Sequence, residues 1–398
     1  MNLKTLNSKL LRYLAVFLTM CMLICFTGCD NGEGEDPSSS DTSQTEEPTN
    51  YHKVGFIFAE SVDSLNFSSM INDQRILASN RCSMDTCYVE NVTISEFENA
   101  VKKLADAGCT DIVSCSSFFT NVCRIMAGKY MNLNFINYGA TTTTANSMAY
   151  TEQIYQGAYV AGMVAGYNST NRRIGIVVDS DLIYDTAVAN AITLGVQWVF
   201  QSAKTFIAEA HSDTDIENAI QALLNNNVDV IVTYTSSAHA EEYCQQRNVK
   251  FVGNHDFSGM EDKYSKMLMY YYSKRDSYFV AKFKQMQFDQ WSAEAYTGTM
   301  GNGVVMVSQA LDNASVKKDT QKVIDAIKTS VSTGEAYIFD GKRGELMDTR
   351  EIVKCLQGYS LSETEIYNMD WFVLGSEKIG TYRRPQLNTP EITLVVKE

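Results

Sequence analysis

Polar and aromatic side chains follow several predicted β-strands, at the point where each strand ends. Asp63 and Asn66 come after the first strand, Ser116 and Ser117 follow DIVSC, and Tyr138 ends the run NFINY. Hydrogen-bonding groups beside aromatic faces suit a flat, polar, uncharged ligand, because rings stack and amides read its edges. Each residue alone is equally consistent with a polar loop cap, but together, at one end of successive strands, they predict a binding cleft.

The second half of the chain repeats this arrangement. Tyr234, Thr235, Ser236 and Ser237 end or follow the run VIVTY, and Asp256 follows FVGNH. A carboxylate such as Asp256 can accept hydrogen bonds from two sugar hydroxyls. We therefore expect residues from both halves to face one ligand.

Catalytic motifs are missing from the sequence. It contains no G-x-S-x-G, no H-E-x-x-H, no phosphate-binding GK[ST] and no G-x-G-x-x-G after a strand. The glycines of Gly298–Gly303 are better explained by a turn before the β-like run VVMV. None of the four histidines stands four residues from another, so a histidine metal site or triad would need distant segments. We expect no enzyme activity, no catalytic residue, no cofactor and no metal.

The chain after Tyr51 alternates short β-rich runs with longer helical patterns, which is typical of a parallel sheet covered by helices on both faces. Thr93-x-x-Glu96 and Thr214-x-x-Glu217 are capping-box patterns that predict helix starts. Gly157, Gly162 and Gly166 predict a helix that packs closely on its neighbour; no apolar 20-residue flank supports a membrane dimer instead. The expected strands are Val54–Phe58, Cys87–Val92, Asp111–Ser114, Phe135–Tyr138, Ile174–Val178, Thr205–Glu209, Val228–Tyr234 and Phe251–Gly253.

Eight strands in two similar series predict an α/β fold with two doubly wound lobes. We expect an N-terminal lobe of residues 51–147 with part of about 257–312, and a C-terminal lobe of residues 148–256 with part of about 313–398. Ligands of such folds bind at the carboxyl ends of the strands.

The first residues have the layout of a signal peptide. Lys4, Lys9 and Arg12 precede an apolar run, Leu14–Ile24, that is too short to cross a bilayer needing ~20 residues. The run leads to Phe26-Thr27-Gly28-Cys29, which resembles a bacterial lipobox and predicts lipidation of Cys29. An ordinary secretory signal or an uncleaved anchor are the alternatives. All three predict export, and with the lipid at Cys29 we expect an outward-facing, extracytoplasmic protein held at the cell membrane.

Residues 30–50 are acidic and lack large apolar side chains, so we expect a disordered tether. With Lys+Arg 33 and Asp+Glu 47, the formal net charge is -14, which argues against nucleic acid or an anionic membrane as a partner. We expect the protein to contact the membrane through the lipid alone and to act as a monomer.

Seven cysteines follow the predicted tether, so at least one thiol is unpaired or intermolecular. Cys82 and Cys87 are the only close pair in the sequence. Their spacing is weak for zinc, and a local disulfide between them is one open alternative.

Between Tyr51 and Leu346 the chain contains, in this order, the segments KVGFIF, QGAYVAGMVAG, NAITLG, DIENAIQALLNNNVDVIVTYTSS, NVKFVGNHD, YFVAKFKQMQFDQW, YTGTMGNGVVMVS and YIFDGKRGEL. This ordered series resembles the basic membrane protein family, the PnrA-like substrate-binding lipoproteins of ABC transporters. The resemblance implies a type I periplasmic-binding fold, with two lobes joined by three crossover strands and a purine nucleoside or related base between them. It also implies a permease and an ATPase as partners.

Carried over to this chain, the resemblance implies that Asn66 reads the base, that Asp256 holds the ribose and that Lys274 or a residue one or two positions away lies near the sugar. The sequence departs from the family at Leu65, where a stacking aromatic is usual. Loss of that face costs ~1 kcal/mol or more. We expect Phe67, Tyr184 or Tyr234 to substitute, or the ligand to differ from a purine.

The leading hypothesis is therefore a binding protein that captures a small neutral solute by hinge closure and delivers it to a permease. One alternative is a sensor that uses the same cleft to signal. Another is an exported hydrolase, which would need a nucleophile and a base that the sequence does not show.

Overall fold

The computed structural model describes residues 52–179 and 182–380, which lie in one compact unit, Pro48–Glu398. The predicted signal peptide with Cys29 and the predicted tether fall outside these residues. Within the described residues, no helix is both long and apolar enough to span a bilayer.

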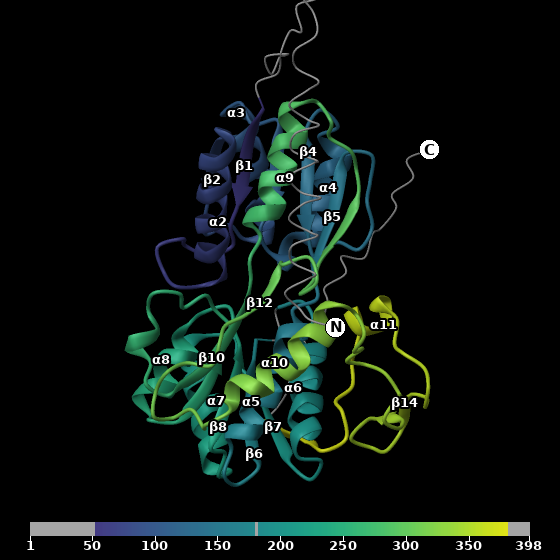
Figure 1. The fold of residues 1–398 in the computed structure, drawn as a ribbon. Helices are drawn as coiled ribbons and strands as arrows, with labels where there is room; N and C mark the ends of the chain where they lie inside the picture. Colours follow the sequence, from purple (N-terminus) through teal and green to yellow (C-terminus); the bar gives the residue numbers. More distant parts are fainter. Residues whose placement is uncertain (1–51, 180–181, 381–398) are drawn as a thin grey trace, which may run out of the picture. The chain divides into compact units, whose positions relative to one another are not determined.

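The first sheet has six strands in the order β2-β1-β3-β4-β5-β11, and every neighbouring pair is parallel. It is covered by α2, α3, α4 and α9 (Figure 1). Its strands are β1 (Lys53–Ile57), β2 (Asp85–Val89), β3 (Asp111–Ser114), β4 (Asn134–Tyr138), β5 (Ser147–Glu152) and β11 (Ala295–Gly298).

The second sheet has seven strands in the order β15-β7-β6-β8-β9-β10-β12, and only β12 runs antiparallel to its neighbour. Its strands are β6 (Arg173–Val178), β7 (Lys204–Glu209), β8 (Val230–Tyr234), β9 (Lys250–Gly253), β10 (Met267–Ser273), β12 (Val305–Val307) and β15 (Ser376–Ile379). A separate pair consists of β13 (Leu346–Met347) and β14 (Val353–Cys355).

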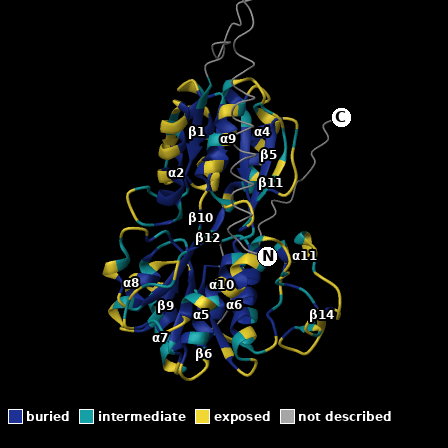
Figure 2. Ribbon diagram, in the orientation of Figure 1, coloured by how far each residue is buried: buried dark blue, intermediate teal, exposed yellow. Residues whose placement is uncertain are grey.

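Helices connect most of the parallel strands, and the strands they cover are largely buried (Figure 2). The helices are α2 (Phe67–Cys82), α3 (Phe97–Asp106), α4 (Thr120–Lys129), α5 (Tyr155–Asn168), α6 (Asp185–Val199), α7 (Asp213–Asn225), α8 (His239–Gln246), α9 (Asp276–Gln287), α10 (Thr320–Ser332) and α11 (Glu363–Tyr367), with short 3-10 helices η2 (Ile94–Glu96), η3 (Ser117–Phe119) and η4 (Glu261–Lys263).

The two sheets share one strand order. In each, the first strand lies between the second and the third: β1 between β2 and β3, and β6 between β7 and β8. In folds of this kind, the loops after these strands diverge at the switch point, which is where ligands bind. The chain crosses between the sheets after β5, after β10 and after β11. The predicted α/β class with two doubly wound sheets is confirmed.

All eight expected strands are present; Asp111–Ser114 coincides with β3, and the others have shifted ends. The second begins at Asp85, because Asp85 and Thr86 pair with β1, and it ends before Asn91, whose φ is 56°. β5 and β10 were not expected as strands. The expected lobe boundary at residue 148 falls inside β5, which pairs with β4 from Ser147 to Tyr150.

The capping-box prediction is confirmed at Thr93 and wrong at Thr214. The Thr93 N–H donates to Glu96 Oε2 at 3.2 Å. In the second case Ser212 is the cap: its backbone is extended and its Oγ accepts from the N–H of Asp215, while Thr214 already lies in α7.

The predicted close approach of the glycine-rich helix is confirmed. A Cβ at Gly162 would meet the carbonyl oxygen of Ile192 in α6, and a Cβ at Gly195 would meet that of Tyr159 in α5. The turn expected at Gly298–Gly303 is also present, and it leads into β12.

Candidate ligand-binding site

A buried ion pair lies where the chain crosses between the sheets. Arg275 stands between β10 and α9, and its Nε and Nη2 lie 2.5 Å and 2.6 Å from the carboxylate oxygens of Glu152, the last residue of β5. Both residues are almost completely buried. Burial alone would lower the pKa of Arg275, but the charge of Glu152 raises it above its ordinary value. Arg275 therefore stays protonated.

Aromatic rings surround this pair. The Arg275 guanidinium lies 4.7 Å from the ring centre of Phe67 and 5.7 Å from that of Tyr138, and the two rings are 5.8 Å apart. Tyr234 is buried as well, and burial raises the pKa of its phenol, with a further contribution from Tyr138. The structure thus places two of the predicted aromatic residues, Phe67 and Tyr138, against a cation that the prediction did not include, whereas the Tyr234 hydroxyl donates to the Ile183 carbonyl.

The loop after β1 contacts the loop after β8. The Phe67 N–H donates to the Ser236 carbonyl at 2.8 Å, and the Ala238 N–H donates to the Leu65 carbonyl at 3.1 Å. Asn66, which lies between these bonds, is the N-cap of α2: its side chain accepts from Ser69 N–H and donates to the Ser61 carbonyl. The Asn66 amide is thus used locally, as a loop cap would be.

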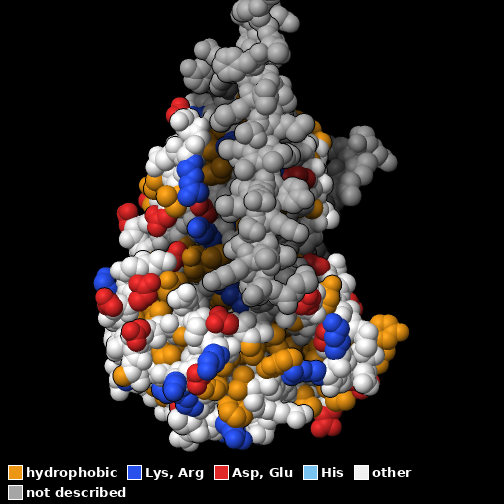
Figure 3. All heavy atoms as spheres, viewed as in Figure 1, with side chains coloured by type: hydrophobic (Ala, Val, Ile, Leu, Met, Phe, Trp, Pro, Cys, Tyr) orange, Lys and Arg blue, Asp and Glu red, His pale blue; other side chains and the backbone are white. Residues whose placement is uncertain are grey.

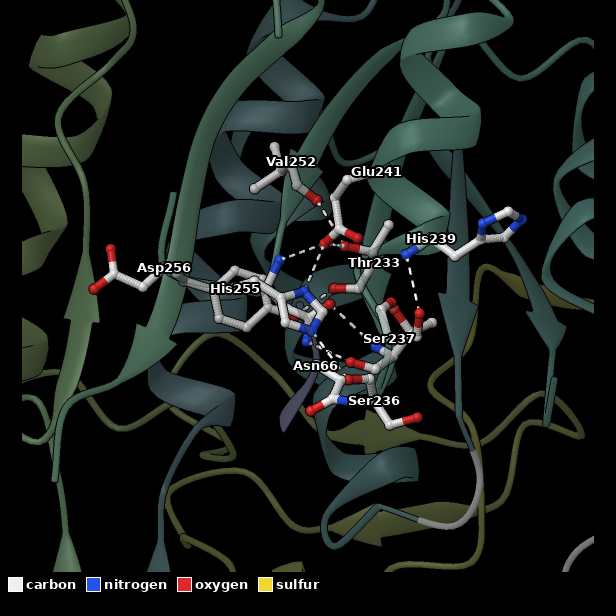
Figure 4. A network of polar contacts seen from close by, with 12 residues as sticks. Asn66, Thr233, Ser236, Ser237, His239, Glu241, Val252, His255 and Asp256 are labelled. Atoms are coloured by element: carbon white, nitrogen blue, oxygen red, sulfur yellow. Dashed lines mark hydrogen bonds and ion pairs between the residues drawn. The ribbon is translucent and has the colours of Figure 1, made fainter. Parts of the chain in front are cut away.

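A buried His–Glu network holds the loop after β8 (Figure 4). Glu241 Oε1 accepts from the Thr233 hydroxyl at 2.8 Å and from the Asn254 N–H at 3.0 Å, and lies 3.2 Å from His255 Nδ1. The other ring nitrogen of His255 lies 3.2 Å from the Ser236 carbonyl. The Ser236 carbonyl therefore contacts both the Phe67 N–H and the buried imidazole of His255.

Asp256 points away from this network (Figure 4). Its Oδ1 accepts from the N–H and hydroxyl of Ser258. The Asp256 N–H donates to the Met70 sulfur at 3.4 Å, so Asp256 lies beside α2 of the first sheet. Lys274 and Asp63 are exposed.

The hydroxyl residues cap loops at the strand ends. Ser116 accepts from the Phe118 N–H as the N-cap of η3, and Ser117 is the first residue of η3. Thr235 is completely buried; its hydroxyl donates to the Ser237 carbonyl, and its N–H donates to Asn254. These residues shape the loops at the switch points.

The space beside Arg275 is small. A cavity of about 10 Å³ lies there, lined in part by Tyr138 and Tyr150. A larger cavity of about 380 Å³ lies elsewhere, between the start of α5, the turn before β12 and α11, and no predicted ligand residue lines it. The cavity beside Arg275 is too small for a base, so a ligand there needs the two loops to separate.

Sequence reasoning missed Arg275 and Glu152. The resemblance pointed to Lys274 within one or two residues, and the structure places Lys274 outside and its neighbour Arg275 inside. No local signal links Arg275 to a glutamate 123 residues away.

Charges of both signs are interspersed on the visible described surface (Figure 3), where no field of one sign dominates. Among the described side chains, no group of three or more His, Cys, Asp or Glu is placed to hold a metal ion.

The chain is similar, over part of its length, to substrate-binding proteins of ABC transporters. A solute-binding protein of an ABC transporter from Conexibacter woesei superposes with a TM-score of 0.60 at 16% identity, covering 72% of this chain and 98% of that one. Residues 51–178 match the model of the family described as PnrA-like ABC transporter substrate-binding proteins, which confirms the predicted resemblance. That family consists of solute-binding proteins and not of enzymes.

Two curated relatives are distant. A purine-binding protein of Brucella abortus is 22% identical over 329 residues, 81% of this chain and 92% of the relative. A putative glucose-binding protein of an ABC transporter from Haloferax volcanii is 22% identical over 266 residues, 66% of this chain and 67% of the relative.

Proposed function

We propose that this protein is exported, anchored by a lipid at Cys29, and captures a purine nucleoside or nucleobase for an ABC importer. The observation that carries the proposal is the pair of aromatic rings, Phe67 and Tyr138, at the first switch point beside Arg275. The match to the PnrA-like family and the purine-binding relative support the same ligand class.

In this proposal the two sheets belong to two lobes that close on the ligand. The backbone bonds from Phe67 to Ser236 and from Ala238 to Leu65 join the lobes in the closed arrangement. Breaking them would expose the rings, so a base could stack on Phe67 or Tyr138. Phe67 then takes the place of the stacking aromatic that Leu65 does not provide.

Arg275 supplies donors near these rings. Its Nη1 donates to the Ser273 carbonyl at 3.3 Å and its Nη2 to Glu152, so the fork keeps further N–H groups for ring oxygens or nitrogens. Since Glu152 balances its charge, the site suits a neutral ligand. Asp256 would hold the ribose of a nucleoside.

A thermal-shift screen of residues 51–398, unfolded and refolded to remove carried-over solute, tests the ligand class. Nucleosides, nucleobases, sugars and amino acids are compared, and a ligand at 100 times Kd adds about 2.7 kcal/mol of stability. A response to purines supports the proposal. A response to sugars alone would overturn the purine assignment and agree with the glucose-binding relative.

Asp256→Ala tests the ribose assignment. We expect it to weaken binding of a nucleoside by roughly tenfold, about 1.4 kcal/mol, and to leave the free base nearly unchanged, because only the nucleoside offers hydroxyls. Calorimetric titration of both ligands measures the difference, and Asp106→Ala, at an exposed carboxylate at the end of α3, is the matched control. Equal loss for both ligands would contradict the assignment.

A further inference from the structure

Two cysteine sulfurs meet at the edge of the first sheet. Cys87 lies in the edge strand β2, and Cys109 lies in the turn between α3 and β3. Their Sγ atoms are 3.2 Å apart, although 22 positions separate them in the sequence. Both are free thiols in the structure.

The intervening strand explains how they meet. Cys87 pairs with Gly55 of β1, and a Cβ at Gly55 would lie 3.1 Å from the Cys109 sulfur. The Cys109 N–H donates to the Leu104 carbonyl, and the next N–H donates to the Lys53 carbonyl, so the turn is held against β1. The missing side chain of Gly55 leaves space that the Leu104 methyl groups and the Cys109 sulfur occupy.

Cys82 does not compete for this partner. It ends α2, and its Sγ lies 3.6 Å from the Val280 carbonyl of α9. The local Cys82–Cys87 disulfide considered from the sequence is therefore replaced by a pairing of Cys87 with Cys109, which only the sheet register brings together.

We propose that Cys87 and Cys109 are a dithiol that closes to an intrachain disulfide by exchange with an external low-molecular-weight disulfide. One sulfur–sulfur bond forms in the protein and one breaks in the oxidant. The two thiols lose two protons and two electrons, and the oxidant is reduced to two thiols. The inference depends on export to an oxidising compartment and not on the identity of the ligand.

Exposure sets the order of the two steps. Cys87 is half-buried, whereas Cys109 is buried, and burial together with the hydrogen bond to Cys87 raises the pKa of Cys109 to about 12. Cys87 attacks the oxidant first and forms a mixed disulfide, and Cys109 then displaces the leaving thiol. The bond would tie edge strand β2 to the turn before β3 and close a loop that contains α3.

The test uses the full chain, reduced, desalted and incubated with oxidised glutathione. We expect non-reducing peptide mapping to find a Cys87–Cys109 link, with the mass of two hydrogen atoms lost. The melting temperature should rise on oxidation. Cys109→Ser should keep glutathione attached at Cys87, because the second thiol is absent, whereas Cys82→Ser should still form the link.

Three results would overturn the proposal: a wild-type chain in which both thiols still react with iodoacetamide after oxidation, a stable glutathione adduct at Cys87 with Cys109 present, or a Cys82–Cys87 link. If a serine variant does not fold, the wild-type peptide map alone shows whether Cys87 and Cys109 are linked. Cys87→Ser, whose melting temperature should not respond to the oxidant, separates this bond from oxidation at other cysteines.

Discussion

At the scale of single residues, the buried pair of His255 and Glu241 couples charge to the position of a loop. Burial alone would lower the pKa of His255, but Glu241 and the Ser236 carbonyl raise it above its ordinary value of 6.5. Burial would raise the pKa of Glu241, yet His255 and the Thr233 and Asn254 donors lower it. Glu60 also faces His255 as a charge, so the imidazolium is favoured from two sides.

The pair predicts a loss of stability at alkaline pH. A histidine whose pKa is raised by folding contributes stability that is complete below pH 6.5 and is lost as the pH rises through its folded pKa. His255→Gln should therefore flatten the fall of the unfolding free energy above pH 6.5 and, by leaving Glu241 without its charged partner, cost about 3–5 kcal/mol near pH 6. Urea unfolding from about pH 6 to about pH 9 measures both effects.

His52 is the control, because its pKa is also raised. Burial alone would lower the pKa of His52, but its hydrogen bonds to Asp111 and Asp289 outweigh that effect. His52→Gln should remove only its own part of the pH dependence. A His255→Gln variant that keeps the whole alkaline fall would show that the buried pair is not its source.

The site residues also show where prediction from sequence ends. Phe67, Tyr138 and Tyr234 could be expected at the cleft, because strand ends meet at one edge of a sheet. Which member of the Lys274–Arg275 pair points inward depends on the backbone direction where β10 becomes α9. Its partner Glu152 comes from a strand that the sequence did not reveal.

At the scale of elements, α5 and α6 pack at backbone distance. Glycines at 162 and 195 let each helix lie against carbonyl groups of the other, and Gly157 leaves room for Tyr271 of β10. This contact was predicted correctly, because small residues four or five positions apart leave one side of a helix open to a neighbouring backbone. The strand β5 was missed because a strand buried on both faces here carries serine, threonine and glutamate instead of an apolar run.

Gly162→Ala should destabilise the protein by about 1–3 kcal/mol, because its Cβ would meet backbone atoms that cannot rotate away. Gly128→Ala in α4 is the matched control: a Cβ there meets nothing within 4 Å. It should be neutral or stabilise by up to about 1 kcal/mol through helix propensity. Urea unfolding compares the two, and equal destabilisation would contradict the backbone clash as the cause.

At the scale of the described molecule, three crossings of the chain join two sheets of equal strand order, and the loops after β1 and β8 meet through two backbone hydrogen bonds. The family resemblance implied the crossings, but the contact could not be predicted from sequence. It depends on backbone groups of Leu65, Phe67, Ser236 and Ala238, whose side chains carry no signal for it. If a ligand drives closure, these two hydrogen bonds should form in the closed state and break in the open state.

Ala238→Pro tests that role, because it removes one of the two donors at a residue whose φ of −72° already suits proline. Loss of one hydrogen bond, about 0.5–1.5 kcal/mol, should shift the equilibrium toward the open form and weaken ligand binding roughly two- to tenfold. Calorimetry measures the affinity, and small-angle scattering without ligand should show a larger radius of gyration than in the wild type.

Ala238→Gly keeps the N–H and removes only the methyl group, so it separates the hydrogen bond from packing. It should bind more tightly than Ala238→Pro and scatter like the wild type. Equal weakening in both variants would assign the effect to the buried methyl group at this position. A bond made only in the closed form stabilises that form and so strengthens binding of a ligand that selects it. Wild-type affinity in Ala238→Pro would therefore mean that the contact between the loops contributes nothing to ligand capture.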